Sequence, residues 1–333
     1  MKLKLLILKI AFKIRSPILL KFLKKAGFFQ IPKIRWIFNP NVLRRNFNYK
    51  KSRALVSLKG FSGEILEVDI NDLIGYNLFV NKEMDPEILA TCISFYNSDK
   101  DIFMDIGANI GSTSIGPCLA TNSRLICIEA SKKNSSLLNK NIYKNKIKAW
   151  SLNCAVTSKK KSDKNRFLDL YLSPGNFGSS SLNSKHSKNY ASTPNEIEHV
   201  PLTTIDKCIN FCNIDPSLIY LVKIDIEGEE LHALKGAKTI FGKVPLLIEY
   251  NTRLNKIALL LDYLSKAYIF YTFDSKLNLC EFDPALTYSS LLCIPILESE
   301  NYLKLYKKRN SLRAKLLLSL PKYGLKRLDK KIQ

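Results

Sequence analysis

The segment FMDIGANIGSTS, residues 103–114, has the composition of a ligand-binding turn. An apolar run ends at Asp105, Gly107 and Gly111 flank Asn109, and a helix is predicted to begin from about residue 111. Glycines permit a tight turn and a close approach of a ligand to the backbone, while the first turn of a helix offers free N–H donors. The spacing therefore predicts a cofactor-binding loop between a strand and a helix.

A carboxylate at the end of the next predicted strand indicates which ligand this loop takes. Glu129 follows Gly111 by eighteen residues, and a carboxylate at that place can accept both ribose hydroxyls of an adenosine-type ligand. Dinucleotide oxidoreductases share this plan and are the first alternative. Their sequence fingerprint has a glycine at the position that Asn109 occupies here, which argues against them. Asp105, in turn, suits a cationic ligand terminus such as that of S-adenosylmethionine.

A second group of charged residues follows the fourth predicted strand. Alternation along that strand puts Lys223, Asp225 and Glu227 on one side, and these three are the candidate catalytic residues. Asp225 is the first choice for a general base, although acids also favour a helix N-terminus and Lys223 could simply pair with Asp225. Glu249 ends the fifth strand, and with Asp225 it could hold Mg²⁺, but two carboxylates do not define a metal site and none is predicted.

The elements that must position these residues alternate between short apolar runs and helical segments. This rhythm predicts an α/β fold with a sheet of about seven mostly parallel strands and helices on both faces. Residues 157–200 interrupt it, and we expect a long loop or lid there, in which GNFGSSSL contacts substrate or cofactor. The predicted strands lie near residues 101–106, 124–130, 147–156, 218–226, 244–250, 268–273 and 291–296.

Taken together, these motifs resemble the FkbM family of methyltransferases. The resemblance implies a Rossmann-like methyltransferase sheet whose last strand runs antiparallel. It also implies methyl transfer from S-adenosyl-L-methionine, mostly to hydroxyl oxygens of sugars, glycan chains or polyketides. By position, Asp105, Gly107, Asn109 and Gly111 would hold the methionine part, Glu129 the ribose, and Asn153 would lie near the adenine. The motifs are FMDIGANIGSTS, ICIEA (126–130), LTTID (202–206), VKIDIEGEELHALKGA (222–237) and PLLIEYN (245–251).

Charge divides the chain into regions. Residues 1–53 form a basic, apolar arm with a net charge of +15, and residues 304–333 carry +10. The rest is close to neutral at −2. We expect a small β element and a helix over 54–100, a methyltransferase domain over 101–300, and a basic C-terminal tail over 301–333.

The two basic ends also carry repeated leucine and isoleucine, so we expect them to bind an anionic membrane surface. Nucleic acid is not the expected partner, because the positive charge lies away from the predicted site. The cysteines are scattered without metal-ligand spacing, and the N-terminus is unlike a signal peptide, so we expect a cytoplasmic protein. Because of its basic ends, we expect it to be peripheral on the cytoplasmic membrane face. The expected acceptor is a hydroxyl of a glycan or glycolipid. A membrane-associated binding protein without catalysis is the second alternative.

Overall fold

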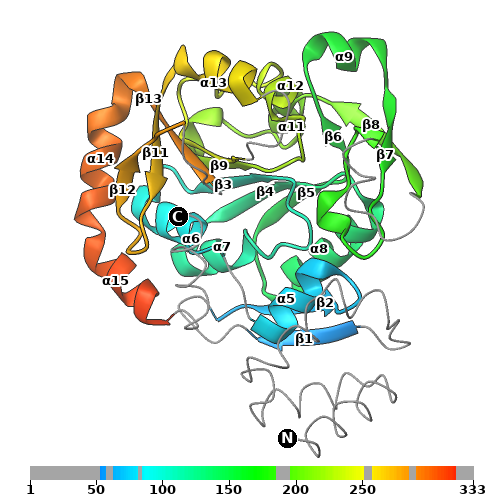
Figure 1. Cartoon of the computed structure of the whole chain (residues 1–333), viewed down its shortest axis with the longest axis horizontal. Coiled ribbons are helices and arrows are strands. Elements are labelled where there is room, and N and C mark those ends of the chain that lie inside the picture. Colours follow the sequence, from blue (N-terminus) through cyan, green and yellow to red (C-terminus); the bar gives the residue numbers. More distant parts are fainter. Residues whose placement is uncertain are drawn as a thin grey trace, which may run out of the picture.

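The computed structural model describes residues 53–57, 63–81, 85–184, 196–250, 257–284 and 290–319. They form a central sheet with helices on both faces, together with two smaller sheets (Figure 1). The predicted N-terminal arm lies outside the described residues, apart from Arg53.

The central sheet has eight strands in the order β12-β11-β13-β10-β9-β3-β4-β5. The strands from β10 to β5 are parallel, whereas β13 runs antiparallel to both β10 and β11, as expected for the last strand. The sheet has the Rossmann-like arrangement expected from the sequence. The strands are β3 (Ile102–Ile106), β4 (Arg124–Ile128), β5 (Ala149–Leu152), β9 (Ile219–Ile224), β10 (Leu246–Glu249), β11 (Tyr268–Phe273), β12 (Leu279–Glu281) and β13 (Ser290–Pro295).

The eighth strand corrects the predicted number of seven. β12 is only three residues long and pairs with β11 at the outer edge of the sheet. A run this short, LCE, carries no alternation that would mark it as a strand, so only its pairing with β11 defines it.

Alternate residues of the central strands build two separate cores. On one face, isoleucines of β3, β4 and β9 pack against α11 (Ile205–Phe211), α12 (Glu230–Leu234) and α13 (Ile257–Ser265). On the other face, Phe103, Leu125 and Leu221 pack against α6 (Pro86–Phe95), α7 (Ile115–Thr121) and α8 (Lys132–Lys144). Burial of both faces explains why these strands are almost continuously apolar. Asp105 and Lys223 are the charged exceptions inside β3 and β9.

Much of the predicted basic tail is folded onto the core. Helices α14 (Ser299–Lys308) and α15 (Asn310–Ser319) lie along α6 (Figure 1). Tyr302 and Tyr306 place their rings edge-on against Phe95, and Arg313 donates to Ser94 Oγ. Residues 301–319 therefore belong to the packed domain, and 320–333 lie outside the described residues. No described helix has the length and apolar character needed to cross a bilayer.

The segment predicted as a loop or lid contains regular structure. Strand β6 (Ala155–Val156) is followed by α9 (Lys159–Lys164), β7 (Phe167–Tyr171), the 3₁₀ turn η3 (Phe177–Ser179) and β8 (Ile197–Thr203). These strands make a three-stranded sheet in the order β6-β8-β7. Residues 185–195 of the segment lie outside the described part.

The small β element expected after residue 53 is an antiparallel hairpin. It consists of β1 (Arg53–Ser57) and β2 (Ile65–Asp69) and is followed by α5 (Leu73–Asn81). The backbone of Leu73 donates to the carbonyl of Gly175. Helix α5 therefore meets the segment that precedes η3, and Gly178 of η3 lies close to Asn109 in the glycine-rich loop.

Candidate active site at the carboxyl ends of the parallel strands

The glycine-rich loop after β3 fits closely against the neighbouring strand. Gly107 has a φ of 81°, and its N–H donates to the carbonyl of Ile128 over 2.9 Å. A Cβ at this position would lie 1.9 Å from the carbonyl oxygen of Asp225. Only glycine fits here, for both its left-handed conformation and its lack of a side chain. The glycine-rich loop is thus in contact with the backbone of Asp225, the candidate base.

Asn109 joins this loop to Glu129. The backbone N–H of Asn109 donates to Glu129 Oε2 over 2.8 Å, and that of Ser131 donates to Oε1 over 2.8 Å. Asn109 has a φ of 51°, a left-handed conformation that asparagine tolerates better than most residues. This hydrogen bond brings Asn109 and Glu129 together, as the sequence predicted.

Glu129 is buried, and its environment changes its acidity. Burial is the largest cause and raises the pKa of Glu129 to about 7, although the two backbone N–H donors and Lys223 lower it. The carboxylate form, which can accept ribose hydroxyls, therefore prevails above neutral pH.

Asp105 and Lys223 form a buried charged group beneath the loop. Lys223 Nζ lies 3.2 Å from Asp105 Oδ1 and 3.4 Å from Asp225 Oδ2, and it donates to the carbonyl of Gly107. Thr113 Oγ1 donates to Asp105 Oδ2. Asp105 is 0 % exposed, so its carboxylate supports the loop from below. Burial lowers the pKa of Lys223, but Asp105 and Asp225 outweigh this effect and raise it, so the ammonium keeps its proton.

Asn153 lies at the end of β5 and holds the backbone next to Glu129. Its Nδ2 donates to the carbonyl of Glu129 over 2.8 Å and to that of Ala130 over 2.9 Å. A place for Asn153 near the adenine stays a prediction. The hydrogen bonds give it the additional task of fixing the carboxyl end of β4.

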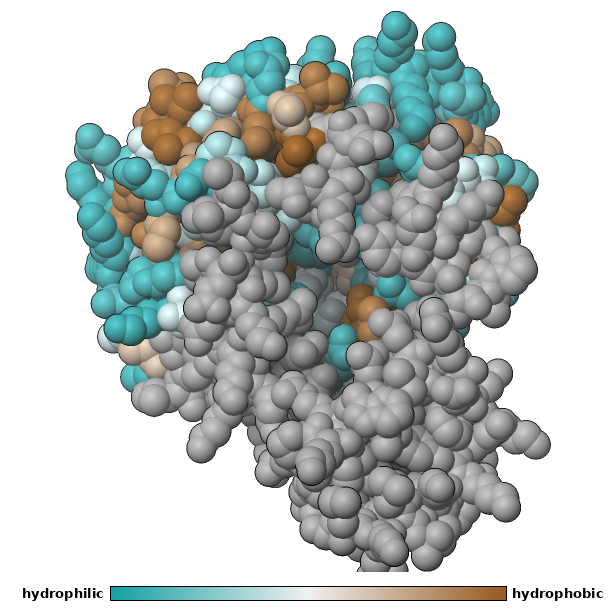
Figure 2. Space-filling view, in the orientation of Figure 1, coloured by the Kyte–Doolittle hydropathy of each residue, from teal (hydrophilic) through white to brown (hydrophobic). Residues whose placement is uncertain are grey.

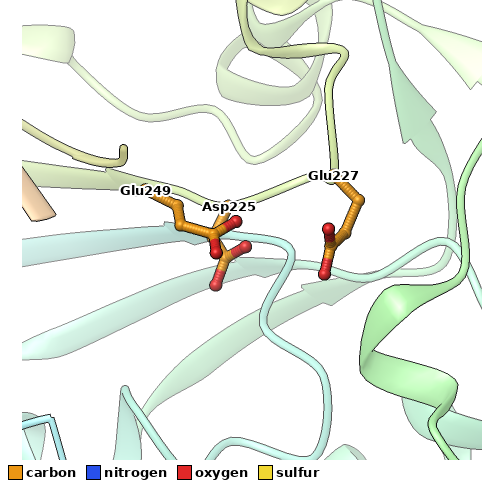
Figure 3. Close-up of side chains that lie close together, drawn as sticks. All are labelled: Asp225, Glu227 and Glu249. Carbon is orange, nitrogen blue, oxygen red and sulfur yellow. The ribbon is translucent and has the colours of Figure 1, made fainter. Parts of the chain in front are cut away.

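Three carboxylates converge beside the loop (Figure 3). Asp225 follows β9, Glu227 stands two residues later, and Glu249 ends β10. One oxygen of each lies within 4.8 Å of the others. Glu227 has a φ of 54° and Gly228 one of 100°, so the chain turns sharply here and directs the Glu227 side chain back toward Asp225 (Figure 3). Glu230 Oε1 accepts from the N–H groups of Ile226 and Gly228 and holds the turn.

Mutual repulsion in this acidic cluster contributes to a raised pKa of Glu249. Burial first, and then the charges of Asp225 and Glu227, raise the pKa of Glu249 to about 10. At neutral pH Glu249 therefore keeps its proton. Three convergent carboxylates can take a proton from a bound hydroxyl, and they could also hold a divalent cation.

Glu249 joins Asp225 and Glu227, which the sequence predicted as catalytic residues together with Lys223. The signal was its place at the end of the strand next to β9, since the carboxyl ends of parallel strands meet at one edge of a sheet. Thr113 was missed, because a threonine in a glycine-rich turn does not reveal a bond to Asp105.

Residues 105–270 match the family described as Methyltransferase FkbM domain. This chain carries an FkbM methyltransferase domain. Its methyl donor is S-adenosylmethionine, and the match spans both the glycine-rich loop and the acidic cluster. Membership in this family decides against the dinucleotide oxidoreductase considered from the sequence.

No curated protein is significantly similar to the chain in sequence. Among solved structures, a precorrin-6y C5,15-methyltransferase from Geobacter metallireducens shares 10% identity over 62% of this chain and 84% of its own, with a TM-score of 0.29. An O-methyltransferase from Bacillus cereus in complex with SAH shares 11% over 62% and 78%, with a TM-score of 0.32. TYW2 from M. jannaschii in complex with AdoMet shares 12% over 74% and 86%, with a TM-score of 0.34. Similarity this low carries no argument about the acceptor of the FkbM domain.

The pKa of Glu129 predicts that cofactor binding depends on pH. Because its pKa in the free protein is raised to about 7, the group is mostly protonated at about pH 6, and binding through the carboxylate must then release a proton. S-adenosylhomocysteine should bind up to about tenfold more weakly for each pH unit below 7. Calorimetry in buffers of different ionisation enthalpy should show proton release at about pH 6 and almost none at about pH 8.5.

Glu129→Gln is the control, since it removes the titrating group. We expect weaker binding at high pH, by roughly 1.5–3 kcal/mol, and no pH dependence across this range. Equal affinity of the wild type at low and high pH would remove Glu129 from the binding site.

Proposed function

We propose that this FkbM domain is an O-methyltransferase that acts on a hydroxyl of a saccharide-containing or lipid-linked acceptor. The observation that carries the proposal is the acidic cluster of Asp225, Glu227 and Glu249 beside the cofactor loop. An alcohol is a poor acid, so its attack on the sulfonium methyl needs a nearby group that takes its proton.

The distance between loop and cluster supports this assignment. The carbonyl of Asp225 is in contact with Gly107, so a cofactor seated on the loop has its methionine end close to the carboxylates. Negative charge there also favours the positively charged sulfonium of the donor. An acceptor hydroxyl between cluster and cofactor would lie in line with the methyl group that it receives.

The charged residues have different tasks in this proposal. Lys223 stays protonated, because Asp105 and Asp225 raise its pKa, so it positions Asp225 and does not act as a base. Asp225 accepts the proton of the acceptor, and Glu227 lies on the other side of the hydroxyl. Glu249 holds its own proton at neutral pH and can donate a hydrogen bond to a neighbouring carboxylate or to a sugar oxygen.

The charge of the cluster also limits the acceptor. Carboxylates attract neutral polyols through hydrogen bonds but repel phosphate groups that come close. A sugar hydroxyl therefore suits this site better than a nucleotide of a nucleic acid. The phosphate of a lipid-linked sugar would have to lie away from the methylated hydroxyl.

Replacing Asp225 should separate binding from chemistry. We expect Asp225→Asn to bind S-adenosylhomocysteine within a few-fold of the wild type but to transfer methyl groups about 100-fold more slowly, as for loss of a general base. Transfer from labelled donor to a membrane glycolipid extract measures this. Glu281→Gln, on the exposed edge strand β12, is the matched control and should keep full activity.

Two results would change this assignment. Unchanged turnover in Asp225→Asn would show that Asp225 has a structural role and is not the general base. Loss of wild-type activity in EDTA, with recovery on adding Mg²⁺, would show that transfer needs a cation, for which these carboxylates are the candidate ligands.

We further propose that the basic ends attach the enzyme to an anionic membrane. Exposed apolar residues of the described part, such as Phe211 and Leu297, lie on separate elements. Among the coloured residues in Figure 2, teal hydrophilic atoms surround separate brown hydrophobic patches. The mixture of basic and apolar residues in 1–53 and after 319 supports contact with lipid through the ends.

Vesicle flotation tests the attachment. The full chain should float with vesicles of phosphatidylcholine and phosphatidylglycerol at low salt and less so at high salt, because each lysine or arginine near the surface adds about 1 kcal/mol. Protein without residues 1–52 and 320–333 keeps every described element and should stay in solution. A full chain that ignores anionic vesicles would contradict the proposal.

A further inference from the structure

The segment of residues 173–181 has a compact structure of its own beside the candidate active site. Ser173 Oγ donates to the carbonyl of Ser179, and Asn176 Nδ2 donates to Ser179 Oγ. The N–H of Ser173 donates to Ser180 Oγ. Ser181 exchanges backbone hydrogen bonds with Tyr171 at the end of β7. These bonds make the segment a defined element, although its composition suggests a flexible loop.

One end of the segment contacts the cofactor loop. The backbone N–H of Phe177 donates to the buried Asp72 Oδ1 over 2.7 Å, which anchors the segment to the start of α5. A Cβ at Gly178 would lie 3.2 Å from Asn109 Nδ2 and 2.6 Å from Ile74 Cδ1. Gly178 thus lies directly against the side chain of Asn109.

The other end contacts the acidic cluster. Ser181 is buried, and its Oγ donates to the backbone carbonyl of Glu227 over 3.0 Å. The same Oγ accepts from the N–H of Asn183, which fixes the direction of the hydroxyl. We propose that Ser181 is a positioning residue that holds the Glu227 backbone so that its carboxylate converges with Asp225 and Glu249.

The backbone of Glu227 explains why it needs such support. Its φ of 54° is unfavourable for a residue other than glycine and is retained only when neighbouring groups hold it. Glu230 holds the N–H groups on either side of Glu227, and Ser181 holds its carbonyl. Without the hydroxyl of Ser181, the peptide after Glu227 can rotate and its side chain can leave the cluster.

Terbium luminescence measures this convergence without a methyl acceptor. Lanthanide ions prefer several carboxylate oxygens at once, so Tb³⁺ is a probe of clustered carboxylates. The full chain should bind Tb³⁺ more tightly than Glu227→Gln, and this difference defines the site. We expect Ser181→Ala to weaken Tb³⁺ binding about fivefold or more, and Ser181→Thr, which keeps a hydroxyl, to restore it to within about twofold.

Ser180→Ala is the matched control. It removes a hydroxyl from the same segment, but this hydroxyl accepts from the N–H of Ser173 and does not hold Glu227. It should bind Tb³⁺ as the wild type does, and all variants should bind S-adenosylhomocysteine within about twofold. If Ser181→Ala does not fold, Ser181→Cys, which is close in size and a weak donor, should show the same loss of Tb³⁺ affinity.

Wild-type Tb³⁺ affinity in Ser181→Ala would overturn the inference, as would equal Tb³⁺ binding by the wild type and Glu227→Gln. The importance of Ser181 for catalysis rests on the proposed role of the cluster. The Tb³⁺ measurement does not depend on that role. If Tb³⁺ binding depends on Ser181 but the protein transfers no methyl group, only the proposed function is rejected.

Discussion

The site depends on one buried cation between two carboxylates. Lys223 is 5 % exposed and contacts both Asp105 in β3 and Asp225 after β9. Charges at this depth are tolerated only when they are paired, because each loses its hydration on burial. The pairing therefore fixes the two neighbouring strands relative to each other at their carboxyl ends. The glycine-rich loop begins at one of these ends, and the acidic cluster begins at the other.

The close approach of the two strand ends has a chemical consequence. Lys223 also donates to the carbonyl of Gly107, so the loop that would seat the donor and the carboxylates that would receive a proton share one support. Glu249 and Glu227 then face Asp225 from the next strand and from the following turn (Figure 3). A reaction that aligns a hydroxyl with a methyl group gains most from such rigid positioning.

The sequence predicted the parts of this arrangement that follow from periodicity and from glycine. The central strands, the tight turn at Gly107 and the place of Glu129 after a strand all depend on local patterns, and the structure confirms the fold class. Local patterns could not predict the edge strand β12 or the packing of α14 and α15 against α6. A three-residue strand and a lysine-rich helix reveal their partners only in three dimensions.

The same limit applies within the site. Lys223 was a candidate catalytic residue by alternation alone, and the sequence could not show that two carboxylates keep it charged. The bond from Ser181 to the carbonyl of Glu227 joins residues 46 positions apart, so no local signal predicts it. The sequence identified which residues could do chemistry, whereas the division of tasks among them required the distances.

Replacing Lys223 tests this account most directly. In Lys223→Met the side chain keeps its approximate length but leaves Asp105 and Asp225 without their cation. We expect the free energy of unfolding to fall by about 3–5 kcal/mol, as for other broken buried pairs, and the affinity for S-adenosylhomocysteine in calorimetry to fall at least about tenfold. Lys140→Met, at an exposed lysine, should change neither quantity. A Lys223→Met protein with wild-type stability and wild-type cofactor affinity would contradict the central role of this ion pair.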